Sequence, residues 1–561
     1  MDRRATLAAL FGAKRSRANT TVQPRTTALT PSLGLTSGLE PYAGPWGYEE
    51  AAHLLRRSMF GPSRSQIEQA VSQGLYPTLA LLFTDTPPPA PPVNPSNTTD
   101  PNVPIGETWI DAPYSTEVNL TPYRAQSLRA WTMELLRTEG VSLREKLTLF
   151  WHNHFGVNTI QDPKFLYRHS ILMRSFAWGN FRELIKQVTI DPAMLRFLNG
   201  NQNTATAPNE NYARELLELF TIGKGPLAGP GDYTNYTEQD VVQMARVLTG
   251  WRDRGFNTTN PDQDVTSVFL AGQHDNGVKQ LSARFNNVQI SNLGNQEYAQ
   301  LIDIIFQQDE VARFISRKLY RWFVYYIIDD NAEANVIQPM AQLLIENDYE
   351  IKPVLEALLG SAHFYDILNV GPMIKNPIDF SISALKQLAV AFPTTLAQRY
   401  TLHFRIFQAI IPMEMEYYNP PSVAGWKAYY QEPQYYRTWI NATTLQARMG
   451  YTNLLSGDGV GQGQLRAKVD PLTAISLLPD PYEPNAVIEG FAQLLFPQPI
   501  TDSQKTALKE VLLPGLPDYV WTAEYAAYEA NPDDPTYADA VEVKIRSLLQ
   551  VMLSMPEFYL S

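Results

Sequence analysis

The sequence predicts an all-α fold with many helices, long irregular loops and at most minor β-structure. From Gly47 onward, apolar residues recur at the spacing of amphipathic helices. The segments between these patterns are polar or proline-rich and do not alternate as strands do. With 561 residues, of which 44% are hydrophobic and 18% charged, the chain is long and apolar enough to build a large core. We therefore expect a folded, predominantly helical protein.

Three parts are expected along the chain. Residues 1–45 are basic and rich in Ser and Thr, which predicts a disordered tail. The alternative is a poor export signal, because Arg3 and Arg4 precede a short apolar run at 7–11 as in twin-arginine signals. This alternative and the lack of cysteine favour an exported, periplasmic or envelope location over the cytoplasm. Residues 46–460 are expected to form a helical core domain, and residues 461–561 a C-terminal helical unit packed on it.

The core domain contains a proline-rich insert at residues 86–104. Proline fixes φ and lacks the donor N–H, so this insert is expected to be an extended surface excursion. A helix follows, which we expect to start at a capping box of Ser142 and Glu145 and to continue to Phe155. At 100° per residue, His154 falls in the middle of the apolar arc of this helix and is predicted to be buried.

Two further helices carry charged residues. In residues 210–220, Glu210, Arg214 and Glu218 form an i, i+4, i+8 ladder beside Glu215. The other helix starts at Thr237, which forms a capping pattern with Asp240, and ends near residue 250. A long polar stretch at residues 253–297 follows it and is expected to be a functional loop or a decoration of the surface.

A later segment, residues 417–439, is unusually aromatic. Aromatic faces with polar edges bind sugars or extended chains and are enriched at interfaces. The residues that this interpretation makes ligand-binding are Trp426, Tyr429, Tyr430 and Trp439. The alternative, given equal weight, is a buried aromatic loop that covers the core.

Composition excludes several classes of function. The chain has no cysteine, so disulfides, thiolate nucleophiles and cysteine-ligated metals are impossible. The net charge of −12 argues against binding nucleic acid through a broad basic face. The sequence contains no run of eighteen apolar residues, so it predicts no transmembrane helix. Nucleophile-elbow, P-loop and dinucleotide-binding motifs are also missing.

The remaining chemistry rests on histidines and carboxylates. His154 beside a carboxylate-rich helix, with His274 and Asp275 from the polar loop, would suit iron, manganese or zinc. We expect His154, Glu218, His274 and Asp275 as metal ligands. The groups expected to move protons or orient charge are His154, Glu215, Arg214 and Lys279. The alternatives are a core imidazole bonded to a main-chain carbonyl and a solvated helix face with ordinary ion pairs.

Several segments together resemble one bacterial family, known as domain of unknown function 1800. The segments are HLLRRSMFGP (53–62), REKLTLFWHNHFGVN (144–158), NENYARELLELFTIG (209–223), YTEQDVVQMARVLTGW (236–251), HDNGVK (274–279) and NPPSVAGW (419–426). The resemblance implies a predominantly helical, often exported protein. It also implies a possible partner, a sulfatase-like protein of the family known as domain of unknown function 1501.

These observations lead to two hypotheses of function. The first is a metal-dependent enzyme whose His/carboxylate site acts on an extracytoplasmic polymer or a modified small molecule. The second is a non-catalytic helical scaffold or binding protein that partners the sulfatase-like protein through the aromatic loop. An enzyme should show a polar cavity that joins the motifs, whereas a scaffold should show those charges in solvent or in plain ion pairs. The substrate and the oligomeric state do not follow from the sequence.

Overall fold

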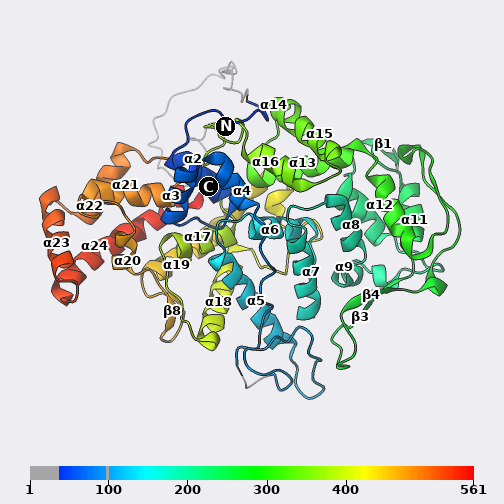
Figure 1. Cartoon of the computed structure of the whole chain (residues 1–561), viewed down its shortest axis with the longest axis horizontal. Helices are drawn as coiled ribbons and strands as arrows, with labels where there is room; N and C mark the ends of the chain where they lie inside the picture. The colour runs from blue at the N-terminus through cyan, green and yellow to red at the C-terminus, as the bar shows by residue number, and fades with distance from the viewer. Residues whose placement is uncertain (1–36, 97–99, 231) are drawn as a thin grey trace, which may run out of the picture.

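The computed structural model describes residues 37–96, 100–230 and 232–561, and these residues form the expected all-α fold (Figure 1). The first half of the chain contains the helices α2 (Tyr48–Ser58), α3 (Arg64–Gln73), α4 (Leu75–Leu82), α5 (Thr121–Thr138), α6 (Arg144–His154), α7 (Pro163–Ser175), α8 (Phe181–Thr189), α9 (Pro192–Phe197), α10 (Asn211–Glu215) and α11 (Glu238–Val247). The middle contains α12 (Glu297–Ile305), α13 (Asp309–Phe323), α14 (Asp330–Ala332), α15 (Gln338–Glu346), α16 (Ile351–Leu359), α17 (Pro377–Gln387) and α18 (Leu396–Ile410). The last part contains α19 (Ala442–Ser456), α20 (Pro471–Ser476), α21 (Pro484–Leu495), α22 (Asp502–Leu512), α23 (Asp518–Ala530) and α24 (Pro535–Ser554).

The β-structure of the described residues consists of four small antiparallel pairs. Their strands are β1 (Leu227–Gly229) with β2 (Asp232–Tyr233), β3 (Trp251–Arg254) with β4 (Thr266–Phe269), β5 (Lys279–Gln280) with β6 (Gln289–Ile290), and β7 (Val460–Gln462) with β8 (Leu465–Ala467). Two of the pairs, β3–β4 and β5–β6, lie between residues 251 and 290. Much of the polar stretch at residues 253–297 is therefore folded into hairpins.

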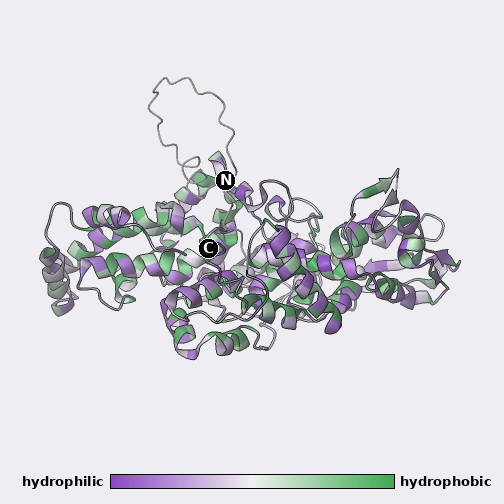
Figure 2. Cartoon of the chain, turned by 90° about the horizontal axis from the view of Figure 1, so that it is seen from above, coloured by the Kyte–Doolittle hydropathy of each residue, from purple (hydrophilic) through white to green (hydrophobic). Residues whose placement is uncertain are grey.

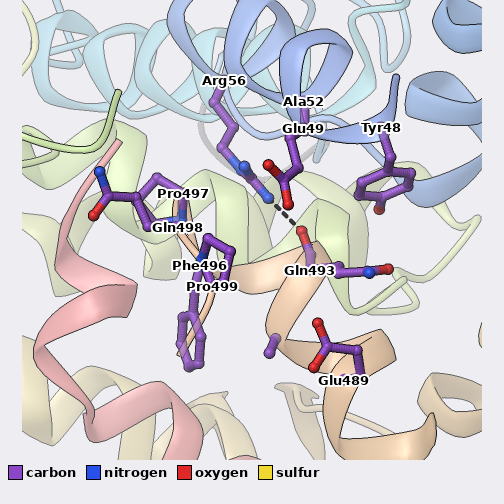
Figure 3. A pocket seen from close by; sticks show the side chains of 11 residues that line it. Tyr48, Glu49, Ala52, Arg56, Glu489, Gln493, Phe496, Pro497, Gln498 and Pro499 are labelled. Carbon is purple, nitrogen blue, oxygen red and sulfur yellow. Dashed lines mark hydrogen bonds between the residues drawn. The ribbon is translucent and has the colours of Figure 1, made fainter. Parts of the chain in front are cut away.

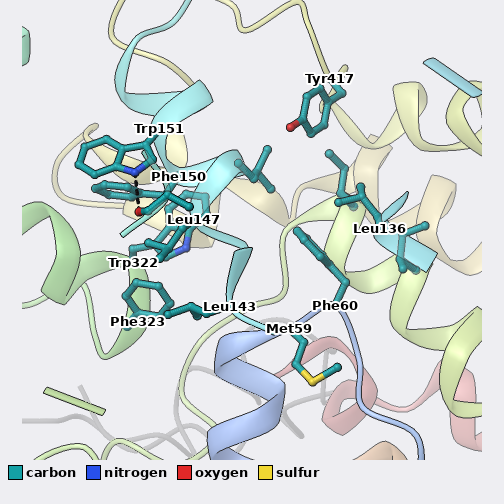
Figure 4. Packing of buried hydrophobic residues seen from close by; sticks show 14 of the residues in the cluster. Met59, Phe60, Leu136, Leu143, Leu147, Phe150, Trp151, Trp322, Phe323 and Tyr417 are labelled. Carbon is teal, nitrogen blue, oxygen red and sulfur yellow. Dashed lines mark hydrogen bonds between the residues drawn. The ribbon is translucent and has the colours of Figure 1, made fainter. Parts of the chain in front are cut away.

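Helix α6 lies at the centre of the core, and all of its residues are buried. Its apolar side chains Leu147, Phe150 and Trp151 pack beside Trp322 of α13 (Figure 4). Neighbours cover this helix on every side, so His154 is buried as predicted. A helix that is enclosed all round must find a partner for each polar side chain it carries.

The predicted capping box at the start of α6 is wrong. The N-cap residue is Leu143, and the Ser142 hydroxyl accepts a hydrogen bond from the backbone N–H of Arg144. Glu145 does not bend back to cap the helix, because its carboxylate pairs with Arg174 of α7 at 2.6 Å in the buried interior. A tertiary ion pair therefore replaces the local cap.

The other two predicted helices form with different ends. Residues 211–221 begin as α10 and widen into a π-helical turn, η2 (Leu216–Thr221). Helix α11 has the predicted capping box, in which the Thr237 hydroxyl accepts from the N–H of Asp240. It ends at Val247, and Gly250, with a φ of 96°, leads into β3.

Removing the cap of α11 should destabilise the protein. We expect Thr237→Ala to lower the free energy of unfolding by about 1 kcal/mol, because the N–H of Asp240 loses its acceptor. Chemical denaturation measures this change. Thr237→Ser keeps the hydroxyl and serves as the control; equal losses in the two variants would contradict the capping role.

The proline-rich insert has no helix among its described residues, as expected. It is nevertheless anchored, since Asp100 pairs with Arg124 of α5 at 2.8 Å and both side chains are fully buried. The indole N–H of Trp131, which is also on α5, donates to the carbonyl of Ala90 at 2.7 Å. The insert is therefore a surface excursion that is fixed to the body at two points.

The predicted tail falls mainly on residues 1–36, which lie outside the described residues, as does the alternative export signal. Residues 37–45 of the same predicted segment pack on the helical body. The N–H of Leu39 donates to the carbonyl of Asn335, and the N–H of Tyr42 donates to that of Gly360.

The C-terminal helices α21–α24 form one end of an elongated molecule, and α11, α12 and β1 lie at the other (Figure 1). In both parts, apolar and polar residues alternate around the helices (Figure 2). After α24 the chain returns to the centre, where Leu560 bridges to Ile374 and the N–H of Ser561 donates to the carbonyl of Met373 at 2.8 Å. Among the described residues, no helix has both the length and the apolar character needed to cross a membrane.

Candidate functional site

The predicted His/carboxylate residues lie in three separate places. His154 is in the core on α6, Arg214, Glu215 and Glu218 are on α10 and η2, and the residues from His274 to Lys279 lie before and at the start of β5. Within residues 37–96, 100–230 and 232–561, no three His, Asp or Glu side chains come close enough together to hold a metal ion. The expected iron, manganese or zinc site thus finds no ligand set in the geometry.

His154 has a protein partner at each ring nitrogen. Nε2 lies 3.0 Å from the carbonyl oxygen of Phe220, so Nε2 carries the proton and donates it. Nδ1 then accepts from Nζ of Lys318, 3.1 Å away. Burial, followed by the charge of Lys318, holds the pKa of His154 well below its usual value. His154 is a neutral core imidazole bonded to a main-chain carbonyl, which is the alternative that the sequence left open.

The carboxylates of α10 and η2 make ion pairs near the surface. Arg214 binds both carboxylate oxygens of Glu238 at 2.8 and 2.7 Å and reaches Glu210 at 3.2 Å. Glu218 does not extend the predicted ladder, because it pairs with Lys224 at 3.2 Å. Burial raises the pKa of Glu215, and the charge of Glu218 adds to the rise. Arg214 and Glu218 thus make ordinary ion pairs, with Glu238, Glu210 and Lys224 as their partners.

His274 and Lys279 share a carboxylate that the sequence did not single out. Glu297, the first residue of α12, accepts from Nε2 of His274 at 2.9 Å and from Nζ of Lys279 at 2.6 Å. The side chains of Glu297 and Lys279 are 0% exposed, and that of His274 is 1% exposed. Asp275 points elsewhere and pairs with Arg246 at 2.7 Å. This triad fastens the polar loop to α12, so its role is structural.

The aromatic segment divides between the core, a pocket and the surface. Trp426 is buried, and its backbone N–H donates to Oδ1 of Asn153 on α6 at 2.9 Å. Tyr429 stacks on Trp322 with ring centroids 4.4 Å apart and meets the edge of Trp439 at 6.0 Å. Tyr430 is 41% exposed. The loop therefore covers part of the core, and two of its rings, Tyr429 and Trp439, also line a pocket.

That pocket, which we call the cationic pocket, lies where α2, α6, α13 and α17 meet the aromatic loop. Its cavity volume is about 20 Å³, and the pocket is open to solvent at its mouth. Two of its aromatic residues, Tyr429 and Trp439, are among those predicted to bind a ligand. The residues that line it are Arg56, Arg57, Lys146, Trp322, Met373, Ile374, Lys375, Asn376, Asp379, Tyr429, Tyr436, Trp439 and Ser561.

Four cationic side chains line the cationic pocket, and all four are buried. Lys146 pairs with Asp379, with Nζ 2.8 Å from Oδ2. Arg56 and Arg57 donate their hydrogen bonds to main-chain carbonyls. Arg57 binds those of Val324 and Asn369 at 3.1 and 3.0 Å, and Arg56 binds that of Leu494 at 3.3 Å. Lys375 donates to the carbonyl of Phe558 at 2.9 Å.

The cationic charges raise one another's electrostatic energy. Burial lowers the pKa of Lys375 to about 7, and Arg56, Lys146 and Arg448 act in the same direction against Asp379. Burial also lowers the pKa values of Arg56 and Arg57 to about 10 and that of Arg448 to about 9. A site that perturbs so many basic groups at once is typical of a functional site.

A second pocket lies on the other side of Arg56, between α2 and α21 (Figure 3). Arg56 reaches across to the carbonyl of Gln493, as the dashed line in Figure 3 shows. The carboxylates of Glu49 and Glu489 line this second pocket. The excess of cations is therefore confined to the cationic pocket.

Sequence reasoning missed Lys375, Glu297 and Lys318, which lie outside the segments taken as motifs. A usable signal was present at Arg56 and Arg57. Neither arginine has an acidic residue three or four positions away, so the helix itself offers neither of them an ion-pair partner at that spacing. Such a pair indicates a buried cationic site more directly than a histidine on an apolar face does.

The comparisons place these residues in one family. A family model described as "Protein of unknown function (DUF1800)" matches residues 53–560, which is nearly the whole chain. The match includes the C-terminal helices and the four cationic residues of the cationic pocket. Curated proteins and solved structures give no match. The chain therefore belongs to the DUF1800 family, as the resemblance of its motifs indicated.

Proposed function

We propose that this protein is a binding protein and that the cationic pocket holds an anionic ligand. The observation that carries the proposal is charge. Arg56, Arg57, Lys146 and Lys375 line the pocket, and Asp379 is the one acidic side chain among its lining residues. Buried charges that lack counter-charges are costly, so an anion that enters is strongly favoured.

The position of α17 supports the same ligand. This helix begins at Pro377, and Lys375, Asn376 and Asp379 place its first turn at the cationic pocket. The N-terminus of a helix carries partial positive charge and favours anions. Its field adds to that of the four side chains.

The test is a titration of the whole protein with sodium chloride, acetate, sulfate and phosphate, followed by calorimetry. We expect at least one of these anions to bind, and Lys375→Met to weaken that binding by about 30-fold or more, since the variant removes a buried partner of the ligand's charge. Lys352→Met removes a half-exposed lysine of α16 and is the matched control. Unchanged binding in Lys375→Met, or no binding of any anion by the native protein, would refute the proposal.

The stability of Lys375→Met separates a binding role from a structural one. Because Lys375 is buried among other cations, its replacement by an apolar side chain should leave the ligand-free protein as stable or raise its stability by about 1–3 kcal/mol. Thermal or chemical unfolding without added anions measures this. If Lys375 served only the fold, Lys375→Met would lower the free energy of unfolding.

Two other expectations from the sequence stay predictions. Catalysis by a metal-dependent site would require His154, Glu218, His274 and Asp275 to act from the separate places described above, and a measurement of metal content in native protein and His154→Ala tests it. The sulfatase-like partner rests on the family resemblance, and co-purification tests it.

A further inference from the structure

Residues that line the cationic pocket carry buried hydrogen-bond donors that have no acceptor among the described residues. They are the indole N–H groups of Trp322 and Trp439 and the Nε–H groups of Arg56 and Arg57, all of them buried. An indole or a guanidinium can only donate, so neither can be satisfied by another donor. Unpaired buried donors are rare in native proteins and cost free energy unless an acceptor meets them.

These donors come from different sides of the pocket. Trp322 belongs to α13, Trp439 to the short helix η9 (Tyr435–Trp439), and the two arginines to α2. Lys375 adds ammonium hydrogens from the residue before the N-cap of α17, and it donates one of them to the carbonyl of Phe558. A ligand that satisfies these donors must offer acceptor atoms in several directions at once.

We infer that the ligand of the cationic pocket carries a tetrahedral oxyanion, a sulfate or phosphate group, either free or as a monoester. This inference rests on the proposed function and uses a separate observation, the donors rather than the charges. A tetrahedral oxyanion presents four oxygens, or three in a monoester, that point in different directions. A carboxylate has two oxygens in one plane, and a halide carries a single charge. Charge-assisted bonds from arginine and lysine suit phosphate and sulfate oxygens.

The aromatic wall suits the remainder of an esterified ligand. Tyr429 and Trp439 stand edge to face, with the Tyr436 ring also in the lining. Their faces offer apolar contact beside the donors, as in sites that hold a charged group and a ring together. The free ion and the ester share the same oxyanion chemistry and differ only in this contact.

The experiment compares anions of different shape on the full-length protein at constant ionic strength. Calorimetry should show sulfate and phosphate binding at least tenfold more tightly than chloride and acetate. Trp439→Phe keeps the ring and removes the N–H, and it should weaken sulfate binding by about tenfold or more. Trp521→Phe removes an indole N–H that donates to the carbonyl of Pro481, far along the chain in α23, and should leave sulfate binding unchanged.

The outcomes separate the two proposals. If chloride or acetate binds as tightly as sulfate, or if Trp439→Phe binds sulfate normally, the oxyanion inference is wrong while anion binding stands. If no anion binds, both fail. Phenyl phosphate then distinguishes the sources: tighter binding than inorganic phosphate supports an ester held by the aromatic wall, and weaker binding supports a free ion.

Discussion

Replacing Glu297 by glutamine is expected to lower the free energy of unfolding by about 3–5 kcal/mol. The carboxylate of Glu297 binds His274 and Lys279, and the side chains of Glu297 and Lys279 have no exposed surface. Glutamine keeps the shape but removes the charge, which leaves the Lys279 ammonium buried without its counter-ion. Chemical denaturation, followed by circular dichroism, measures the loss.

Two controls define the cause of this loss. Glu68→Gln in the exposed pair with Arg64 should change the stability by less than about 1 kcal/mol. The double variant Lys279→Met, Glu297→Leu removes both buried charges and should recover much of the stability lost in Glu297→Gln. If Glu297→Gln matches the native protein, the triad does not hold the polar loop in place.

The affinity for sulfate is expected to fall as the pH rises above 7. In the free protein, burial lowers the pKa of Lys375 to about 7, from the 10.5 of a free lysine. A bound anion favours the ammonium form, so binding takes up a proton at any pH above that pKa. Below it, the ammonium is already present and the affinity is constant. Above it, the affinity falls by about tenfold per pH unit, or about 30-fold between pH 6 and pH 8.5.

The groups that face Lys375 allow this assignment. Asp379 favours its charged form, and Arg56, Lys146 and Arg448 oppose it. Arg56 and Arg57 have pKa values of about 10 and Arg448 has one of about 9, so these three arginines stay mainly protonated over this range. Calorimetry in buffers of different ionisation enthalpy measures the affinity and the proton uptake together. Lys375→Arg keeps the charge at every pH and should flatten the profile; an unchanged slope in that variant would assign the proton elsewhere.

Local signals predicted the fold well. The helical periodicity of residues 237–247, with Thr237 and Asp240 at the start, determines α11, because a capping box needs only residues three apart. The same reasoning failed at Ser142 and Glu145, where Arg174 from another helix offers Glu145 a stronger partner than its own backbone. Local rules hold where no distant charge competes.

The site could be predicted less well. Periodicity correctly buried His154, but burial alone does not say what meets its nitrogens, and these partners, Phe220 and Lys318, are distant in sequence. The aromatic segment contributes Tyr429 and Trp439 to the pocket as ligand-binding residues would, whereas Tyr430 faces solvent. Residue types singled out this segment but did not determine the direction of each ring.

The sequence by itself determined the all-α class, the family and the absence of cysteine chemistry, because composition, periodicity and motif order are properties of the chain. Only the tertiary structure decided which charges meet. Arg56, Lys146 and Lys375 are separated by about ninety residues or more, yet they line one pocket. The lowered pKa values of Arg56 and Lys375 and the unpaired Nε–H of Arg56 arise from exclusion of water by helices distant in sequence, and no local pattern encodes that exclusion.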